Sequence, residues 1–367
     1  RKFMKLFKSL LVAPATLGLL APMAASANEV TINDFNAAEE IAVTNSRVDG
    51  LEARFNDLEA GSFSETTTAS FGVDFLVGAV DKTGANEKVT FDYQMGIGLE
   101  TSFTGEDSLS ATIDIGETGS VIGGADGLNF DSTTNALNLD GLTYSFPLGG
   151  ATVLVGDQTD VSAVYTGACA YNAFTDYMGN CGTGNSLGLG GKGVTAAMSY
   201  AFDSGFSLAG GVSSPESEIL GEGSLSLDDD GNFGTDIFGI EAAYTADSYG
   251  VSVAYTDAES TTYWGINGMY AFDFATISAG IESEDADGSD SATGFFVGIS
   301  FPEVGAGSLD IGMGTTGNFT DSDPEYYTYE ASYAYPVNDG MTITPGVYIV
   351  EGDTDVTGFA VKTSFSF

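Results

Sequence analysis

Residues 357–367 read Thr357-Gly358-Phe359-Ala360-Val361-Lys362-Thr363-Ser364-Phe365-Ser366-Phe367. Large apolar residues alternate with small or polar ones, and this period of two predicts a β-strand with one apolar and one polar face. A strand that ends on an aromatic residue is typical of the closing strand of a membrane β-barrel, whose aromatic side chains lie at the lipid boundary. The stretch therefore favours a transmembrane barrel.

The same alternation recurs along the chain from residue 66 onward. We count sixteen segments with strand character, and an even number is what a barrel with both ends on the same side requires. The segments are 66–80, 89–103, 108–116, 138–148, 151–158, 193–202, 206–214, 236–245, 250–257, 262–272, 275–283, 291–301, 308–315, 326–336, 341–351 and 356–367.

The connections between these segments are of two kinds. Some are tight and contain Gly, Asp or Asn, whereas the connections at 117–137, 159–192 and 215–235 are long. Short turns on one side and long loops on the other are typical of outer-membrane barrels. We therefore expect an all-β fold, a 16-stranded antiparallel transmembrane β-barrel over residues 61–367; a soluble sandwich, which would show the same alternation, is the alternative.

The N-terminal part has a different pattern. Lys5 and Lys8 precede an apolar stretch at 10–20 and a small-residue site at 25–27, which predicts a signal peptide over residues 1–27. Residues 28–60 carry apolar side chains at heptad spacing and predict a short periplasmic helix or coiled coil; the alternative is a helix that lies against the barrel or plugs it. The heptad positions are Ile41, Thr44, Val48, Leu51, Phe55 and Leu58.

The composition excludes several classes of function. With 52 acidic and 10 basic residues, the chain has a formal net charge of −42, so it cannot neutralise nucleic-acid phosphates. It contains no histidine, the commonest general base and metal ligand. We therefore expect no enzyme, no catalytic residues and no cofactor.

The chain has two cysteines, Cys169 and Cys181. In an exported protein the expected state is a disulfide between them. A metal pair or a catalytic thiol is the alternative, but it lacks a third ligand nearby. Two loop stretches, 228–232 and 285–290, resemble pieces of calcium loops without the distal bidentate glutamate; the weak calcium candidates are Asp228, Asp230, Asp285 and Asp287.

Sixteen strands leave a water-filled lumen, and the alternation assigns residues to its wall. Carboxylates in a passage stabilise cations and repel anions, which predicts a cation preference, unless these acids merely keep the lumen wet. The expected pore-lining residues are Asp74, Asp92, Glu100, Asp114, Glu241, Glu282, Asp310, Glu330 and Lys362.

Several stretches resemble a known family, the cyanobacterial outer-membrane porins of the carbohydrate-selective (OprB-type) group. The resemblance spans roughly residues 45–367 and is most specific at the two ends. The stretches that carry it are Arg47-Val48-Asp49-Gly50-Leu51-Glu52-Ala53-Arg54, Tyr144-Ser145-Phe146-Pro147-Leu148, Tyr335-Pro336-Val337-Asn338-Asp339-Gly340, Ile343-Thr344-Pro345-Gly346-Val347 and Lys362-Thr363-Ser364-Phe365-Ser366-Phe367.

The resemblance implies a homotrimeric channel in the outer membrane, surrounded by lipid, for passive diffusion of small hydrophilic solutes such as inorganic ions and carbohydrates. In sixteen-stranded porins the third external loop commonly folds inward and sets the constriction. Here that loop is 159–192, and its candidate constriction residues are Tyr165, Tyr171, Phe174, Asp176 and Tyr177. The alternative function is a structural or surface-interaction barrel with a plugged lumen and calcium-binding loops.

Overall fold

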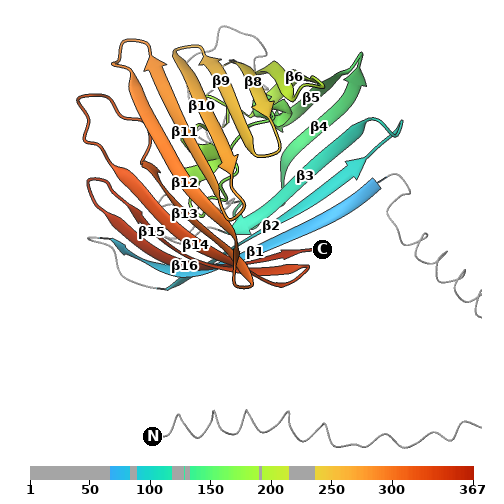
Figure 1. Cartoon of the computed structure of the whole chain (residues 1–367). Coiled ribbons are helices and arrows are strands. Elements are labelled where there is room, and N and C mark those ends of the chain that lie inside the picture. Colours follow the sequence, from blue (N-terminus) through green and yellow to red (C-terminus); the bar gives the residue numbers. More distant parts are fainter. Residues whose placement is uncertain (1–66, 83–88, 118–127, 129–132, 190–191, 215–235) are drawn as a thin grey trace, which may run out of the picture. The chain divides into compact units, whose positions relative to one another are not determined.

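The computed structural model describes residues 67–82, 89–117, 128, 133–189, 192–214 and 236–367, where sixteen antiparallel strands form one closed barrel (Figure 1). The predicted fold class is confirmed. The signal peptide and helix expected over residues 1–60 lie outside the described part of the chain. The strands are β1 (Thr67–Lys82), β2 (Thr90–Thr101), β3 (Ser108–Glu117), β4 (Asn138–Leu148), β5 (Ala151–Thr159), β6 (Gly193–Ala201), β7 (Phe206–Ser214), β8 (Ile237–Thr245), β9 (Tyr249–Ala258), β10 (Thr261–Ala271), β11 (Thr276–Ala286), β12 (Ala292–Val304), β13 (Gly307–Thr315), β14 (Tyr327–Asn338), β15 (Met341–Val350) and β16 (Val356–Ser366).

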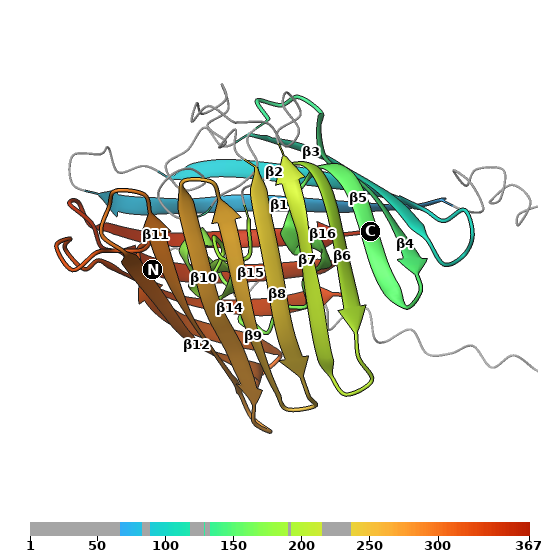
Figure 2. The same ribbon diagram turned by 90° about the horizontal axis from the view of Figure 1, so that it is seen from above.

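Each strand pairs with its sequence neighbours, and the first pairs with the last. In the closing pair, Gly72 of β1 lies opposite Ser366 of β16, and the register continues to Lys82 opposite Val356. Backbone hydrogen bonds between Phe71 and Phe367 extend the pairing to the final residue. Because every strand has two partners, the barrel has no open edge (Figure 2). No helix among the described residues is long and apolar enough to cross a membrane.

The two faces of the wall are apolar outside and largely polar or small inside. On β9, Val251, Val253 and Tyr255 are exposed, whereas the alternate residues Ser252, Ala254 and Thr256 are buried. A soluble sandwich would bury the large apolar set instead. The observed arrangement is the one that a hydrocarbon environment favours, because lipid solvates apolar side chains and the lumen solvates polar ones.

Aromatic side chains form a belt at the end of the barrel where the short turns lie. Neighbouring rings are in contact, with centroids 4.7 Å apart for the pair Phe206 and Tyr244 and 4.6 Å apart for Tyr270 and Phe272. Such a belt is typical of the boundary between hydrocarbon and water. It includes the Tyr144–Phe146 pair, whose centroids are 5.5 Å apart.

The short turn between β2 and β3 is organised around one carboxylate. Asp107 accepts hydrogen bonds from the Ser102 hydroxyl, from the backbone N–H groups of Phe103 and Thr104, and from the Tyr144 hydroxyl, at 2.7–2.9 Å. The donors, above all the backbone of Thr104, lower the pKa of Asp107 well below its usual range.

Replacing Asp107 with alanine is expected to destabilise the barrel at neutral pH. A depressed pKa means that the stabilisation is fully present above the unfolded-state pKa, about 4, and is lost as the pH falls toward the folded-state value. The difference in thermal stability between Asp107→Ala and the parent protein should therefore shrink on acidification below pH 4. The adjacent exposed Glu106→Ala is the control, and an equal effect from both variants would contradict the prediction.

Candidate functional site

The segment Asp160–Leu189, between β5 and β6, lies inside the barrel. We call it the inner loop. It contains two short helices, η2 (Val161–Val164) and η3 (Asp176–Gly182), drawn in green within the ring of strands in Figures 1 and 2. Its contacts are with residues of β5 to β15. It runs along the wall to β15 at Phe174 and then returns.

Three glutamates of the barrel wall hold the inner loop through its backbone. Glu241 on β8 accepts hydrogen bonds from the N–H groups of Thr166 and Gly167, at 2.7 and 2.9 Å. Glu282 on β11 accepts from the Ser186 N–H at 2.7 Å and from the Asn185 amide at 2.9 Å. All three glutamates, including Glu330, are buried beneath the loop, where hydrogen bonds offset the cost of removing a carboxylate from water.

Glu330 on β14 holds the far end of the loop. One oxygen accepts from the Tyr171 hydroxyl and the Phe174 N–H, and the other accepts from the N–H and the hydroxyl of Thr175, at 2.6–2.9 Å. Burial and the nearby Glu330 carboxylate raise the pKa of Tyr171, which keeps its hydroxyl a donor at physiological pH. Four donors on one carboxylate make this the most heavily bonded of the three glutamates among the described contacts.

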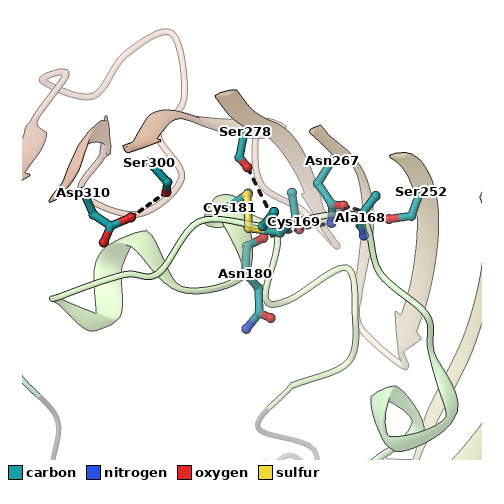
Figure 3. Close-up of a disulfide and its surroundings, with 11 residues drawn as sticks. Ala168, Cys169, Asn180, Cys181, Ser252, Asn267, Ser278, Ser300 and Asp310 are labelled. Carbon is teal, nitrogen blue, oxygen red and sulfur yellow. Dashed lines mark hydrogen bonds between the residues drawn. A yellow bond between two sulfur atoms is a disulfide. The ribbon is translucent and has the colours of Figure 1, made fainter. Parts of the chain in front are cut away.

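Neutral side chains hold the loop between these anchors. Asn267 on β10 accepts from the Ala168 N–H at 3.0 Å and donates to Thr183 at 2.9 Å, so one amide joins the outgoing and returning passes. Ser278 on β11 accepts from the Ala170 N–H. Cys169 and Cys181 form a disulfide that links the same two passes beside Ser278 (Figure 3).

A belt of glycines provides the space that the loop occupies. At each of these positions, an added Cβ would lie closer than 3.0 Å to an atom of the inner loop. Tyr171 lies over two of them on β12 and β13, and Phe174 covers one on β15. The glycines are Gly239, Gly265, Gly280, Gly298, Gly312 and Gly346.

The predicted pore-lining acids fall into two groups in the structure. Glu241, Glu282 and Glu330 are covered by the inner loop, and Asp310 is buried with a hydrogen bond from Ser300 at 2.5 Å. Asp92 is also buried. The remaining acids are partly or fully exposed on β1 to β3: Asp74, Glu100 and Asp114.

The exposed group forms a polar stretch of the inner wall. Asp74 accepts a hydrogen bond from Gln94 at 3.0 Å, and Glu100 accepts one from Ser108 at 2.8 Å. Lys362 on β16 pairs in register with Leu76 on β1, next to these acids. Elsewhere on the wall, Lys192 forms an ion pair with Asp140 at 2.5 Å. Among the predicted pore-lining acids, those that are not buried therefore lie on β1 to β3.

The five candidate constriction residues all belong to the inner loop. Tyr165 lies over Gly239, and Tyr171 and Phe174 face the wall. Asp176 and Tyr177 line a polar cavity of about 310 Å³ with Glu282 and Asn318. The loop therefore keeps its two buried aromatic rings against the barrel and leaves Asp176 of η3 exposed.

The four calcium candidates come from two separate stretches of the chain. Asp228 and Asp230 lie outside the described residues. Asp285, near the end of β11, and Asp287, in the turn after β11, are exposed, and Asp285 is 3.5 Å from the Ser291 hydroxyl. Within the described ranges, no three Asp, Glu, His or Cys side chains converge as a metal site requires.

Comparison with known sequences gives one distant relative to report. No protein-family model matches the chain. An uncharacterized protein of Nostoc sp. is 25% identical over 438 residues, covering 97% of this chain and 75% of that protein. The identity is too low to transfer a role between the two proteins.

Several solved structures share the barrel at low sequence identity. OprB of Pseudomonas putida superposes with a TM-score of 0.62 at 12% identity, covering 82% of this chain and 94% of that one. An anion-selective porin of Comamonas acidovorans superposes with a TM-score of 0.60 at 14% identity, covering 82% of this chain and 99% of that one. The trimer form of OmpT, an outer membrane protein of Vibrio cholerae, superposes with a TM-score of 0.55 at 10% identity, covering 83% of this chain and 100% of that one. The chain thus has the fold of outer-membrane porins.

Proposed function

We propose that this protein is an outer-membrane porin, a passive diffusion channel for inorganic ions and other small hydrophilic solutes, carbohydrates among them. The observation that carries the proposal is the inner loop: a closed barrel with an apolar outer face contains a segment that narrows its lumen from within. Loop and wall together make a water-filled passage of restricted width, which selects solutes by size.

The proposal includes a preference for cations. Support comes from the partly exposed acids on β1 to β3, with Lys362 as the lysine next to them on β16. Carboxylates at a narrow passage lower the energy of cations there. The anion-selective porin of Comamonas acidovorans has the same fold, so the side chains, and not the fold, decide the sign of selectivity.

Further parts of the proposal concern assembly and export. We propose that residues 1–27 direct export, that 28–60 form a periplasmic helix, and that three copies assemble in the outer membrane. The trimer form of OmpT supports the trimer, and the apolar outer face with its aromatic belt supports insertion into lipid. Chemical crosslinking of the purified protein in detergent would report the number of copies.

The test is a planar bilayer across a tenfold KCl gradient. We expect a stable conductance and a reversal potential on the cation side. Replacing Asp74 and Asp114 with asparagine should move that potential toward zero, whereas Asp273→Asn, an exposed acid of a short turn, should leave it unchanged. No conductance from folded, inserted protein would overturn the channel and favour a plugged structural barrel.

A further inference from the structure

The inner wall of the barrel has an apolar stretch at the loop ends of β1, β15 and β16. Leu76 and Val80 on β1, Tyr348 and Val350 on β15, and Ala360 on β16 form one buried cluster. The residues between them, including Val77 and Ile349, point outward and are exposed. This part of the wall is therefore apolar on both faces. It differs from β9, where the buried inward residues include the polar side chains Ser252 and Thr256.

An apolar inner wall in contact with water is unfavourable, so something must cover it. Phe174 of the inner loop covers one part: it lies over Gly346, and its ring is 6.5 Å from that of Tyr348, centroid to centroid. Leu128 covers another part. It comes from a different loop, between β3 and β4, and is only 4% exposed within the same cluster.

We propose that Leu128 is a second constriction residue, which covers the apolar loop ends of β1, β15 and β16 on the inner wall together with Phe174. This inference rests on the proposed channel function. Leu128 and Phe174, from two different connections, contact the wall at one place, and we define the hydrophobic junction as Leu128, Phe174 and the apolar cluster beneath them. The junction removes the loop ends of β1, β15 and β16 from the aqueous path and leaves Asp74 and Lys362 beside it.

A consequence is that solutes pass along the other part of the wall. The inward residues of β2 and β3, among them Gln94, Thr112 and Asp114, are partly exposed and polar. Covering the apolar side directs solutes toward these groups. Leu128 therefore determines both the width of the passage and the side chains that a solute meets.

The first test is chemical protection, which does not depend on conductance. The chain's two native cysteines are joined in a disulfide, so an introduced cysteine is the single free thiol. In folded protein, Leu128→Cys should react with a membrane-impermeant maleimide at least about tenfold more slowly than Leu137→Cys, because a buried thiol is inaccessible. Leu137 is 66% exposed in the same connection and serves as the matched control. Equal reaction rates for the two cysteine variants would overturn the proposal that Leu128 is buried against the wall.

The second test is the width of the passage. Leu128→Asp should detach residue 128 from the apolar wall and raise single-channel conductance by roughly 1.3-fold or more, with a larger polymer-exclusion limit, because conductance follows the open cross-section. Leu137→Asp should leave both quantities unchanged. If Leu128→Asp does not fold, Leu128→Ala, which truncates without adding charge, should show a smaller rise in the same direction.

The outcomes separate this inference from the proposed function. A parent protein that conducts, with Leu128 variants of unchanged conductance and exclusion limit, would overturn the constriction role and keep the channel. A folded, inserted parent protein that does not conduct would overturn the channel, whatever the labelling shows. Slow maleimide labelling of Leu128→Cys together with a wider passage in Leu128→Asp would support both the channel and the constriction role of Leu128.

Discussion

Replacing Glu330 with glutamine is expected to release the far end of the inner loop. Both carboxylate oxygens accept two hydrogen bonds each from Tyr171, Phe174 and Thr175. The side-chain amide of glutamine has only one oxygen, so whichever way the amide is turned, its NH₂ group faces two of the four donors. Buried donors without an acceptor, together with the lost charge-assisted bonds, should cost on the order of 3 kcal/mol in the loop's attachment.

Hydrogen exchange measures this attachment directly. A cost of about 3 kcal/mol corresponds to roughly a hundredfold loss of protection, and it should appear at the amides of Phe174 and Thr175. Single-channel current should also become noisier as the loop detaches and returns. Glu303→Gln, an exposed acid at the end of β12, is the control. Unchanged protection at Phe174 and Thr175 would show that the loop does not depend on Glu330.

Replacing Gly280 with alanine is expected to push the returning pass of the loop into the lumen. The added methyl would lie 2.1 Å from the Cys181 carbonyl oxygen and 3.1 Å from its carbonyl carbon. The clash is with backbone, and the disulfide between Cys169 and Cys181 limits how that backbone can adjust. Overpacking of this kind typically costs about 1–3 kcal/mol.

The expected result of Gly280→Ala is a narrower passage and a lower melting temperature. The wall is a closed hydrogen-bonded sheet, so the loop, and not the strand, must shift, and it can shift only into the lumen. Single-channel conductance and thermal unfolding measure the two effects. Gly72→Ala on β1 is the matched control, because its nearest neighbour would be 4.0 Å from the new methyl. A conductance as large as that of Gly72→Ala would contradict the proposed displacement.

The fold could be predicted from local pattern because a barrel repeats one rule sixteen times. Each predicted segment coincides with a strand, from 66–80 with β1 to 356–367 with β16. Alternation decides which side chains share a face, and the Gly, Asp and Asn of the turns mark where each strand ends. Both signals depend only on neighbouring residues, so a single sequence contains them.

The role of the wall glutamates could not be predicted in the same way. Alternation places Glu241 and Glu330 on the inner face, but it does not say whether water or another segment lies above them. The path of the inner loop decides this, because its N–H groups bond to the carboxylates across 74 to 156 positions of the chain. A contact of that separation has no periodic signature.

The glycine belt and the apolar junction were also missed by sequence reasoning. In the sequence, Gly280 and Gly312 are simply small residues of amphipathic strands. The one signal for a covering segment was that these glycines face inward on strands whose outward residues are bulky. Leu128 lies in a long connection without any pattern. Both features depend on the shape of the opposing segment, which appears only when the chain is closed into a barrel.

By itself, the sequence therefore determined the class of the fold, the strands, the faces and the acidic character of the protein, since each follows from composition or from residues two positions apart. Tertiary structure alone decided which carboxylates meet water, where the inner loop lies and which side of the lumen is covered. The reason is physical: burial and hydrogen bonding of Glu282 or Leu128 depend on atoms that closure of the barrel brings together from distant parts of the chain.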